Sequence, residues 1–323
     1  SVKVAVTGAS GFVGGAICRA LRDAGDEVVP LVRRPASQLP GARIVARFDR
    51  ESLAPALTGC DAVIHAAAVV HRRSAKLEEY VAFNVGGTEA LCEASRDAGV
   101  RRLVLLSSVK VYGEGPFDRE GRVTEETETA GEQGYAGTKL TAERVVTAHE
   151  ADFADGTCIF RLVPVYGVGD KGNVRSMIVN AARRTLAVPG PGLTQKSIVH
   201  VQMVAKACAR AVHASHRGVF ILADPHAPTM RELADSIASS LGKRPAPSLP
   251  IAPFLLAARV VDKGLQLLRR PPQDVQGLVK KSQFRTVFDP SKYERTFGDT
   301  LHVDLDASIR EEVAWLRHVG TIR

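Results

Sequence analysis

Aromatic residues are scarce in this sequence: they make up 5% of the 323 positions and include a single tryptophan. The apolar residues are mostly alanine, valine and leucine, which favours helices packed on a sheet over a β-sandwich. A long uninterrupted apolar run is also missing, because the most apolar stretch, residues 251–268, contains Arg259, Asp262 and Lys263. A membrane span needs about 20 apolar residues. We therefore expect no span, and interpret 251–268 as an amphipathic helix that caps a pocket rather than an anchor.

Cysteine is sparse, odd in number and widely spaced. The five residues follow no metal-ligand or CxxC spacing: Cys18, Cys60, Cys92, Cys158 and Cys208. This pattern predicts reduced core cysteines and no metal site, as in a cytoplasmic protein. No signal peptide is expected either, because residues 2–6 already have the pattern of a strand.

The positive charge is moderate. The formal net charge is +8, and arginines occur along the whole chain. We interpret them as a solvated surface; the alternative is a field that attracts anionic small molecules such as dinucleotides and nucleotide sugars. No basic stretch interleaved with aromatics and no helix-turn-helix pattern is present, so nucleic acid is not expected as a partner.

Strand and helix patterns alternate through the first half of the chain. Apolar runs predict strands at 2–6, 27–32, 62–65, 102–107 and 157–162, and helical patterns at 88–98 and 135–149 lie among them. Such βαβ units predict an α/β fold with a doubly wound parallel sheet of the Rossmann type. We expect an NAD(P)-binding domain over 1–165 and a smaller mixed α/β substrate domain over 166–323. Strand-like segments near 197–224 are candidates to return to the first domain.

A glycine-rich segment, Thr7 to Gly14, joins the first strand to the first helix. Its glycines let the backbone turn sharply and approach a pyrophosphate, and the helix N-terminus then offers unpaired N–H groups. The position between strand and helix makes this segment the predicted phosphate site of a dinucleotide. The residues that we expect to bind are Gly8, Ser10, Gly11, Phe12, Val13 and Gly14.

The end of the second strand predicts which dinucleotide binds. An acidic residue there holds the ribose hydroxyls of NAD, whereas an arginine accommodates the phosphate of NADP. Here Arg33 and Arg34 follow the strand and no acid is present. This favours NADP, with NAD as the open alternative; the other interpretation is that both arginines only face solvent. Asp49 and Arg50, after the expected third strand, are candidates to meet the adenine.

Small residues follow the strand at 62–65. Ala66, Ala67 and Ala68 allow a cofactor to lie against the backbone there, and we interpret the preceding His65 as a packed residue rather than a catalyst. Asn84 either fixes a strand through its side chain and lines the cofactor site, or simply caps a helix.

A phenol and an ammonium lie one helical turn apart at Tyr135 and Lys139. The ammonium favours the phenolate and lowers a pKa that starts near 10. Such a tyrosine can exchange a proton with a substrate oxygen while hydride moves at carbon. Ser108, at the end of a strand, can hydrogen-bond the same oxygen. We expect these three residues to be catalytic, with Tyr135 and Lys139 also contacting the cofactor.

These segments together carry a family resemblance. The sequence resembles the extended short-chain dehydrogenases/reductases of the nucleotide-sugar epimerase/dehydratase group, and most closely those that act at C4 as 4-keto reductases or 4-epimerases. The matching segments are TGASGFVG (7–14), HAAA (65–68), NVGGT (84–88), SSVKVYG (107–113), YAGTK (135–139) and RLVPVYGVGDKGN (161–173).

The resemblance implies the cofactor, the substrate class and some contacts. It implies a nicotinamide cofactor, a nucleotide-diphosphate sugar substrate, substrate contacts at Ser108, Lys110, Tyr135, Asn173 and Lys196, and cofactor contacts at Pro164 and Val165. Relatives of this kind often form homodimers through helices that correspond to 88–98 and 135–149.

Several positions depart from the family pattern. Pro164 stands where the family often has asparagine, Val168 replaces a usual proline, and Gln202-Met203 replaces an acidic pair. Dehydratases carry an acidic pair after the catalytic serine, where this chain has Val109 and Lys110, so we do not expect 4,6-dehydration.

Four functions remain open from the sequence. The first is an NADPH-dependent 4-keto reductase of a nucleotide sugar, and the second is a 4-epimerase with retained NAD. The third is a reductase of a steroid- or flavonoid-like ketone, with the helix at 251–268 lining an apolar pocket. A regulator without turnover is the fourth, and the intact Ser/Tyr/Lys set is evidence against it.

Overall fold

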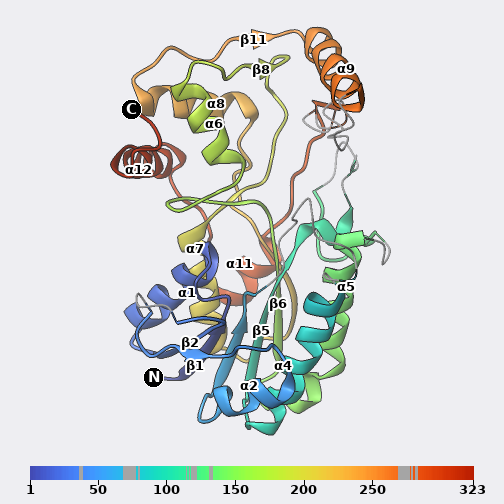
Figure 1. The fold of residues 1–323 in the computed structure, drawn as a ribbon, viewed down its shortest axis with the longest axis vertical. Helices are drawn as coiled ribbons and strands as arrows, with labels where there is room; N and C mark the ends of the chain where they lie inside the picture. Colours follow the sequence, from blue (N-terminus) through green and yellow to red (C-terminus); the bar gives the residue numbers. More distant parts are fainter. Residues whose placement is uncertain are drawn as a thin grey trace.

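The computed structural model describes residues 1–35, 39–67, 78, 81–113, 115, 117, 122–130, 134–267, 277, 279–280 and 283–323. Within these ranges the side chains of Tyr135, Phe254 and Leu267 are outside the description. Two lobes lie one above the other, with the large sheet in the lower lobe of Figure 1.

A seven-stranded parallel sheet forms the centre of the lower lobe. Its order is β10-β6-β5-β4-β1-β2-β3, and every neighbouring pair is parallel. The strands are β1 (Lys3–Thr7), β2 (Glu27–Val32), β3 (Arg43–Ile44), β4 (Ala62–His65), β5 (Arg102–Ser108), β6 (Thr157–Leu162) and β10 (Gly218–Leu222). The order reverses between β1 and β4, which is where α/β sheets of this kind bind dinucleotides. The predicted Rossmann fold is confirmed.

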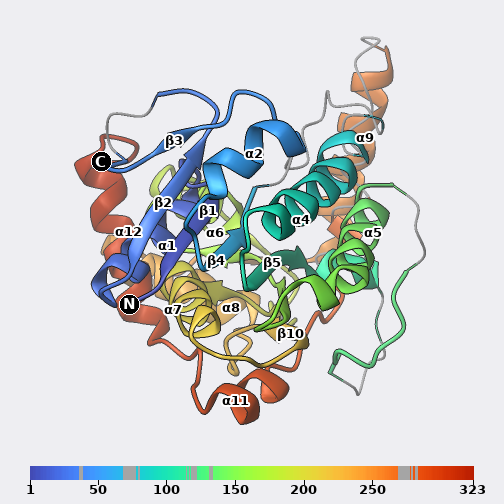
Figure 2. The same cartoon turned by 90° about the horizontal axis from the view of Figure 1, so that it is seen from below.

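Helices cover both faces of the sheet, as Figure 2 shows. On one face lie α1 (Phe12–Asp23), α7 (Val201–Val212) and α11 (Ser291–Phe297); on the other lie α2 (Arg50–Leu57), α4 (Gly87–Asp97) and α5 (Gly134–Ala148). Alternate side chains of one strand feed two cores: Val4 and Val6 of β1 join the first, and Ala5 joins the second. This explains why the strands have continuous apolar runs.

Short helical segments connect several of these elements. They are the π-helix η1 (Val81–Gly86) and the 3₁₀ helices η2 (Val109–Tyr112) and η3 (Glu150–Asp152). All five cysteines are buried and unpaired.

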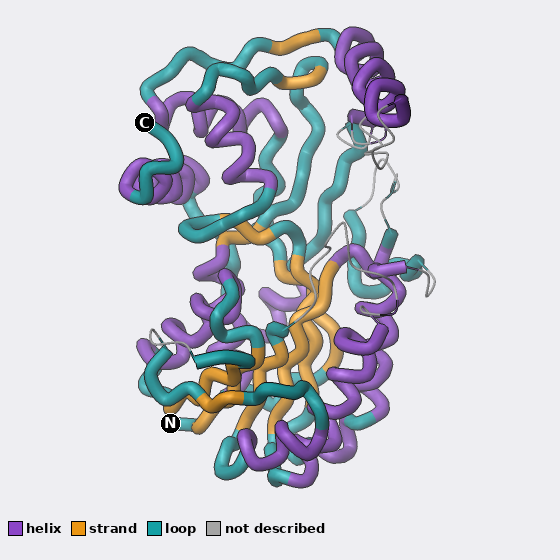
Figure 3. Tube along the Cα trace, in the orientation of Figure 1, coloured by secondary structure: helices purple, strands orange, loops and turns teal. Residues whose placement is uncertain are grey.

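The upper lobe has its own core. It contains α6 (Asn173–Ala182), α8 (Met230–Leu241), α9 (Ile251–Leu267) and α12 (Leu305–His318), with the short strand pairs β7 (Val165–Tyr166) with β9 (Val199–His200) and β8 (Val188–Pro189) with β11 (Ser248–Leu249). Apolar residues of α6, α8 and α12 pack together there. The chain leaves this lobe for α7 and β10 and leaves it again for α11, so its path between the lobes is not a single crossing (Figures 1 and 3). The boundary at 165/166 stays a prediction.

None of the helices in the described ranges is long and apolar enough to cross a membrane.

Candidate active site

The glycine-rich loop is packed too tightly for side chains at two positions. Gly8 has a φ of +68°, and a Cβ there would lie 2.8–2.9 Å from main-chain atoms of Ala66 and Ala67. A Cβ on Gly14 would lie 2.1 Å from the carbonyl oxygen of Gly8. Gly11 donates its N–H to the same oxygen at 2.9 Å. The ends of β1 and β4 are therefore held together at the point where the strand order reverses.

The N-terminus of α1 is arranged to receive an anion. Gly11 caps it in an extended conformation without a side-chain hydrogen bond, and the first turn contains no acidic residue. Unpaired N–H groups and the positive end of the helix dipole are thus available to a pyrophosphate. A Cβ on Gly169 would lie 3.3 Å from the ring of Phe12, so the loop after β7 lies against this one. The donor set fits the phosphates of a dinucleotide.

A directed chain of hydrogen bonds fixes the floor of the site. Thr88 donates its only hydroxyl proton to the Asn84 carbonyl at 2.6 Å, so it must accept from His65 Nε2 at 3.2 Å. In a neutral imidazole Nδ1 is then the acceptor and receives the Thr7 hydroxyl proton at 2.8 Å, while Thr7 Oγ1 accepts the N–H of Ala67 at 3.0 Å. Burial, followed by the charge of a nearby lysine, lowers the pKa of His65 to about 3. His65 is a neutral, buried link between elements.

Asn84 lies in η1, and its side chain reaches α5. Its amide donates to Thr138 Oγ1 at 3.2 Å, and the residue is buried. Both sequence interpretations of this residue, as a strand-fixing or helix-capping asparagine, therefore miss the contact with α5. A cofactor contact for Asn84 stays a prediction, and Ala68 lies outside the described residues.

The arginines after β2 are exposed. Arg33 and Arg34 directly follow the strand, and within the described ranges neither forms an ion pair. Asp49 instead caps α2 by accepting from the N–H of Ser52 at 2.9 Å, and Arg47 Nε donates to its other oxygen at 2.8 Å.

Asp49 and Arg50 both already have partners in this structure. The Arg47 guanidinium and the cap lower the pKa of Asp49 to about 2. The guanidinium of Arg50 binds Asp97 of α4 at 2.6 and 3.0 Å. The adenine contacts predicted for Asp49 and Arg50 have to compete with these partners.

Ser108 accepts a backbone hydrogen bond through its hydroxyl oxygen. It ends β5 and caps η2, where its oxygen accepts the N–H of Lys110 at 3.2 Å. An acceptor site of the oxygen is therefore used and its proton is left to donate to a substrate oxygen.

Lys139 is buried on α5, one turn after Tyr135. Burial lowers its pKa to about 8, and the carboxylate of Glu143, one turn further along the helix, opposes this shift. The backbone of α5 places Tyr135 and Lys139 on one face, but the side chain of Tyr135 lies outside the described part of the structure.

The predicted substrate contacts come from separate elements. Lys110 and Asn173 are both exposed, Lys110 in η2 and Asn173 at the first position of α6. Lys196 is partly buried, and its ammonium donates to the Phe284 carbonyl at 2.5 Å. The carbonyl of Pro164 accepts the N–H of Val199 in β9 at 3.1 Å. This hydrogen bond lies next to Val165 and connects the two lobes.

A buried ionic network that the sequence did not predict lies beside α5. Glu143 accepts from Ser107 Oγ at 2.5 Å and from Arg161 at 2.6–3.2 Å, and Arg161 donates to the Tyr112 hydroxyl at 2.7 Å. Two features of the sequence could have indicated it. Arg161 is a charged residue inside an apolar strand, and Glu143 follows Lys139 by the same four residues that separate Lys139 from Tyr135. The network joins α5 to the ends of β5 and β6.

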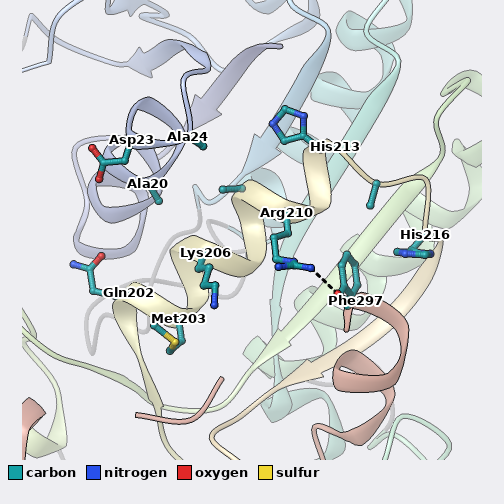
Figure 4. Close-up of a pocket in the computed structure, with 12 residues that line it drawn as sticks. Ala20, Asp23, Ala24, Gln202, Met203, Lys206, Arg210, His213, His216 and Phe297 are labelled. Atoms are coloured by element: carbon teal, nitrogen blue, oxygen red, sulfur yellow. Dashed lines mark hydrogen bonds between the residues drawn. The ribbon is translucent and has the colours of Figure 1, made fainter. Parts of the chain in front are cut away.

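A hollow of about 660 Å³ lies away from this site, and Figure 4 shows the residues that line it. It is at the other end of α1, between α1, α7 and α11, and several of its polar side chains already have partners: Lys206 and Arg210 pair with Asp299, and His213 contacts Asp26. It has no features of a catalytic site.

Comparisons with known proteins agree with this geometry. The family model described as the NAD dependent epimerase/dehydratase family matches residues 4–222. UDP-glucose 4-epimerase of Vibrio cholerae is 29% identical over 264 residues, which cover 77% of this chain and 78% of that protein. The 2-alkyl-3-oxoalkanoate reductase of Stenotrophomonas maltophilia is 29% identical over 255 residues, 75% and 76% of the two chains.

Among solved structures, MoeE5 in complex with UDP-glucose and NAD is similar along the whole chain. It superposes with a TM-score of 0.75 at 26% identity, covering 98% of this chain and 99% of that one.

The chain belongs to the NAD dependent epimerase/dehydratase family. It is an NAD(P)-dependent enzyme of the extended short-chain dehydrogenase/reductase type, as the resemblance implied.

Proposed function

We propose that the enzyme reduces the 4-keto group of a nucleotide-diphosphate sugar with NADPH. The observation that carries the proposal is the end of β2, where exposed Arg33 and Arg34 stand beside the phosphate loop in place of an acid. Guanidinium groups bind a ribose phosphate through charge-assisted hydrogen bonds, and a reductase must exchange its cofactor with a reduced pool.

The protein's own groups handle the proton. When bound, the cofactor supplies a hydride to the carbonyl carbon. Ser108 donates a hydrogen bond to the carbonyl oxygen, and Tyr135 gives it a proton as it gains charge. The Lys139 ammonium, held in a buried position, then stabilises the phenolate that remains.

Binding of a diphosphate group is the feature that distinguishes a nucleotide-sugar substrate from the alternatives. We expect Lys196 to contact the diphosphate, far from the reacting carbon, and Lys110 and Asn173 to contact other parts of the substrate. Lys196→Ala should raise KM with a smaller effect on kcat, because such a contact is about equal in the ground and transition states. Lys206→Ala, a surface lysine paired with Asp299, is the matched control and should leave both constants unchanged.

Two other reactions have specific support. A 4-epimerase with retained NAD is favoured by the Vibrio relative and by MoeE5 with its bound UDP-glucose and NAD. Reduction of a lipid-like ketone is favoured by the Stenotrophomonas relative. Purified protein that keeps NAD through gel filtration would support the epimerase.

Thermal shift with NADPH present separates the substrate classes. UDP, TDP or GDP should raise the melting temperature if the substrate is a nucleotide sugar, whereas a steroid should not. If no nucleoside diphosphate protects and an apolar ketone does, the nucleotide-sugar proposal is wrong.

Tyr135→Phe tests the proposed catalytic tyrosine. It should lower turnover by roughly two to four decades and leave NADPH binding near wild type. Unchanged turnover would remove Tyr135 from the catalytic set.

We also propose a cytoplasmic homodimer that associates through α4 and α5. Light scattering at several concentrations would measure the assembly, and a monomer at all of them would contradict it.

A further inference from the structure

One end of the upper lobe exposes apolar side chains. Among the described residues eight large apolar side chains are strongly exposed, and four of them lie between residues 249 and 261: Leu249 (42%), Leu256 (64%), Val260 (65%) and Val261 (48%). The others are spread over the chain, so this stretch is a patch rather than the normal scatter of exposed hydrophobics. We call these four residues the α9 patch.

The helix that carries the patch is apolar on both sides. Ile251, Leu255, Ala258 and Leu265 face the protein, at the spacing of one helical face. Leu256 and Val260, one turn apart, point away from it with about two thirds of their surface exposed. A helix exposed to water is normally polar on its outer side. In Figures 1 and 2 α9 projects from the edge of the upper lobe.

Basic residues border the patch. Arg259 and Lys263 are exposed on α9 itself, and Arg244 and Lys280 are exposed on either side of the helix in the sequence. Residues 243–285 contain nine Lys and Arg against two Asp, a net charge of +7 out of the +8 of the whole chain. The rest of the chain has 34 Lys and Arg against 33 Asp and Glu, so the excess of positive charge lies almost entirely in the segment that contains α9.

Of three possible partners, only an acidic membrane matches both the positive charge and the apolar side chains. A second copy would bring two strongly positive patches together in a symmetric interface, where they repel. A nucleic acid would satisfy the charge but would leave Leu256 and Val260 in water. An acidic bilayer covers both, since its headgroups are negative and its interfacial region accepts apolar side chains.

We propose that α9 docks the enzyme on a membrane surface rich in acidic phospholipids. The helix lies in the plane of the interface, with Leu256, Val260 and Val261 among the upper acyl carbons and Arg259 and Lys263 at the phosphates. The contact is peripheral. It is independent of the substrate proposed above, because nothing in it involves the catalytic residues.

Vesicle flotation of the whole chain tests this docking. The protein should bind vesicles of phosphatidylcholine with 30% phosphatidylglycerol, bind pure phosphatidylcholine vesicles far less, and be released by salt. Arg259→Glu with Lys263→Glu should weaken binding more than about twentyfold, since each basic residue near the surface contributes about fivefold. Leu256→Ser with Val260→Ser should weaken it at least about tenfold at constant charge.

Controls distinguish docking from general stickiness or misfolding. Ile44→Ser changes an exposed apolar residue on β3, in the other lobe, and should bind like wild type. All these positions are exposed, and thermal melts should coincide. The proposal is overturned if acidic vesicles are not bound, if the α9 variants bind like wild type, or if sedimentation shows instead that Leu256→Ser with Val260→Ser dissociates a dimer.

Discussion

Glu143→Gln is predicted to destabilise the protein strongly, although it changes no atom that reacts. Glu143 and Arg161 have only 5% and 7% of their side chains exposed and are 2.6 Å apart. The substitution keeps the shape of the side chain but removes its charge. The Arg161 guanidinium then stays buried with the Tyr112 hydroxyl and an amide oxygen as its partners.

The expected loss follows from the cost of an unpaired buried charge. Removing one partner of such a pair costs about 3–5 kcal/mol, and the hydrogen bonds that glutamine can still make place this variant near 3 kcal/mol. That is a large part of the stability of an ordinary domain, about 5–15 kcal/mol. Urea unfolding followed by circular dichroism would measure the free energy of unfolding.

The matched control is an exposed pair that lies just before the same two strands, β5 and β6. Arg101 and Asp155 are 2.9 Å apart but have 59% and 43% of their side chains exposed. Water screens this pair, so Asp155→Asn should lose only a small fraction of what Glu143→Gln loses. Equal losses in the two variants would refute the reasoning.

A second measurement tests the effect of Glu143 on Lys139. Burial lowers the pKa of Lys139 to about 8 and Glu143 raises it. In the free enzyme kcat/KM should therefore fall above about pH 8, as the ammonium loses its proton. Glu143→Gln should move this alkaline limb to lower pH, and Asp155→Asn should not. A limb that stays in place would mean that the role of Glu143 is structural only.

Three further outcomes are expected. Gly14→Ala should weaken cofactor binding at least about tenfold, since its Cβ would lie 2.1 Å from a carbonyl oxygen; Gly15→Ala meets nothing closer than 3.6 Å and should bind like wild type in the same fluorescence titration. Changing Arg33 and Arg34 to Ala should weaken NADPH by roughly one to two decades per lost contact and leave NADH nearly unchanged; equal loss for both would remove the phosphate assignment. Burial, together with nearby Asp170, raises the pKa of Glu312 to about 8, so the folded state holds a proton that the unfolded state has lost. Stability should then fall between about pH 4.5 and pH 8 by up to about 1.4 kcal/mol per pH unit, and Glu312→Gln should flatten this slope in urea titrations.

Local patterns were sufficient for the first half of the fold. The predicted strands and helices there agree with β1, β2, β4, β5, β6, α4 and α5 to within one residue at each end. Parallel strands buried on both faces must be apolar throughout, and a phosphate loop needs glycine at fixed positions, so both leave a signal in a short window of sequence. The proposed catalytic pair Tyr135 and Lys139 is also a local pattern, because the two residues are one helical turn apart.

Contacts between residues far apart in the chain could not be predicted from patterns in a short window of sequence. Arg50 was expected near an adenine, and nothing in its own segment marks its partner Asp97, which is 47 residues further along the chain. Asn84 was interpreted from its own segment, but its partner Thr138 is 54 residues away.

The sequence by itself determined the fold class, the glycine-rich loop and the spacing of the proposed catalytic pair, since each depends on residues close together in the chain. The tertiary structure decided the partners of charged groups. Glu143 and Arg161 become one buried pair only because β6 lies beside β5 and beneath α5. It also decided which apolar residues stay in water: Leu255 and Leu256 are adjacent in the sequence, and only the packing of α9 turns the first inward and leaves the second exposed.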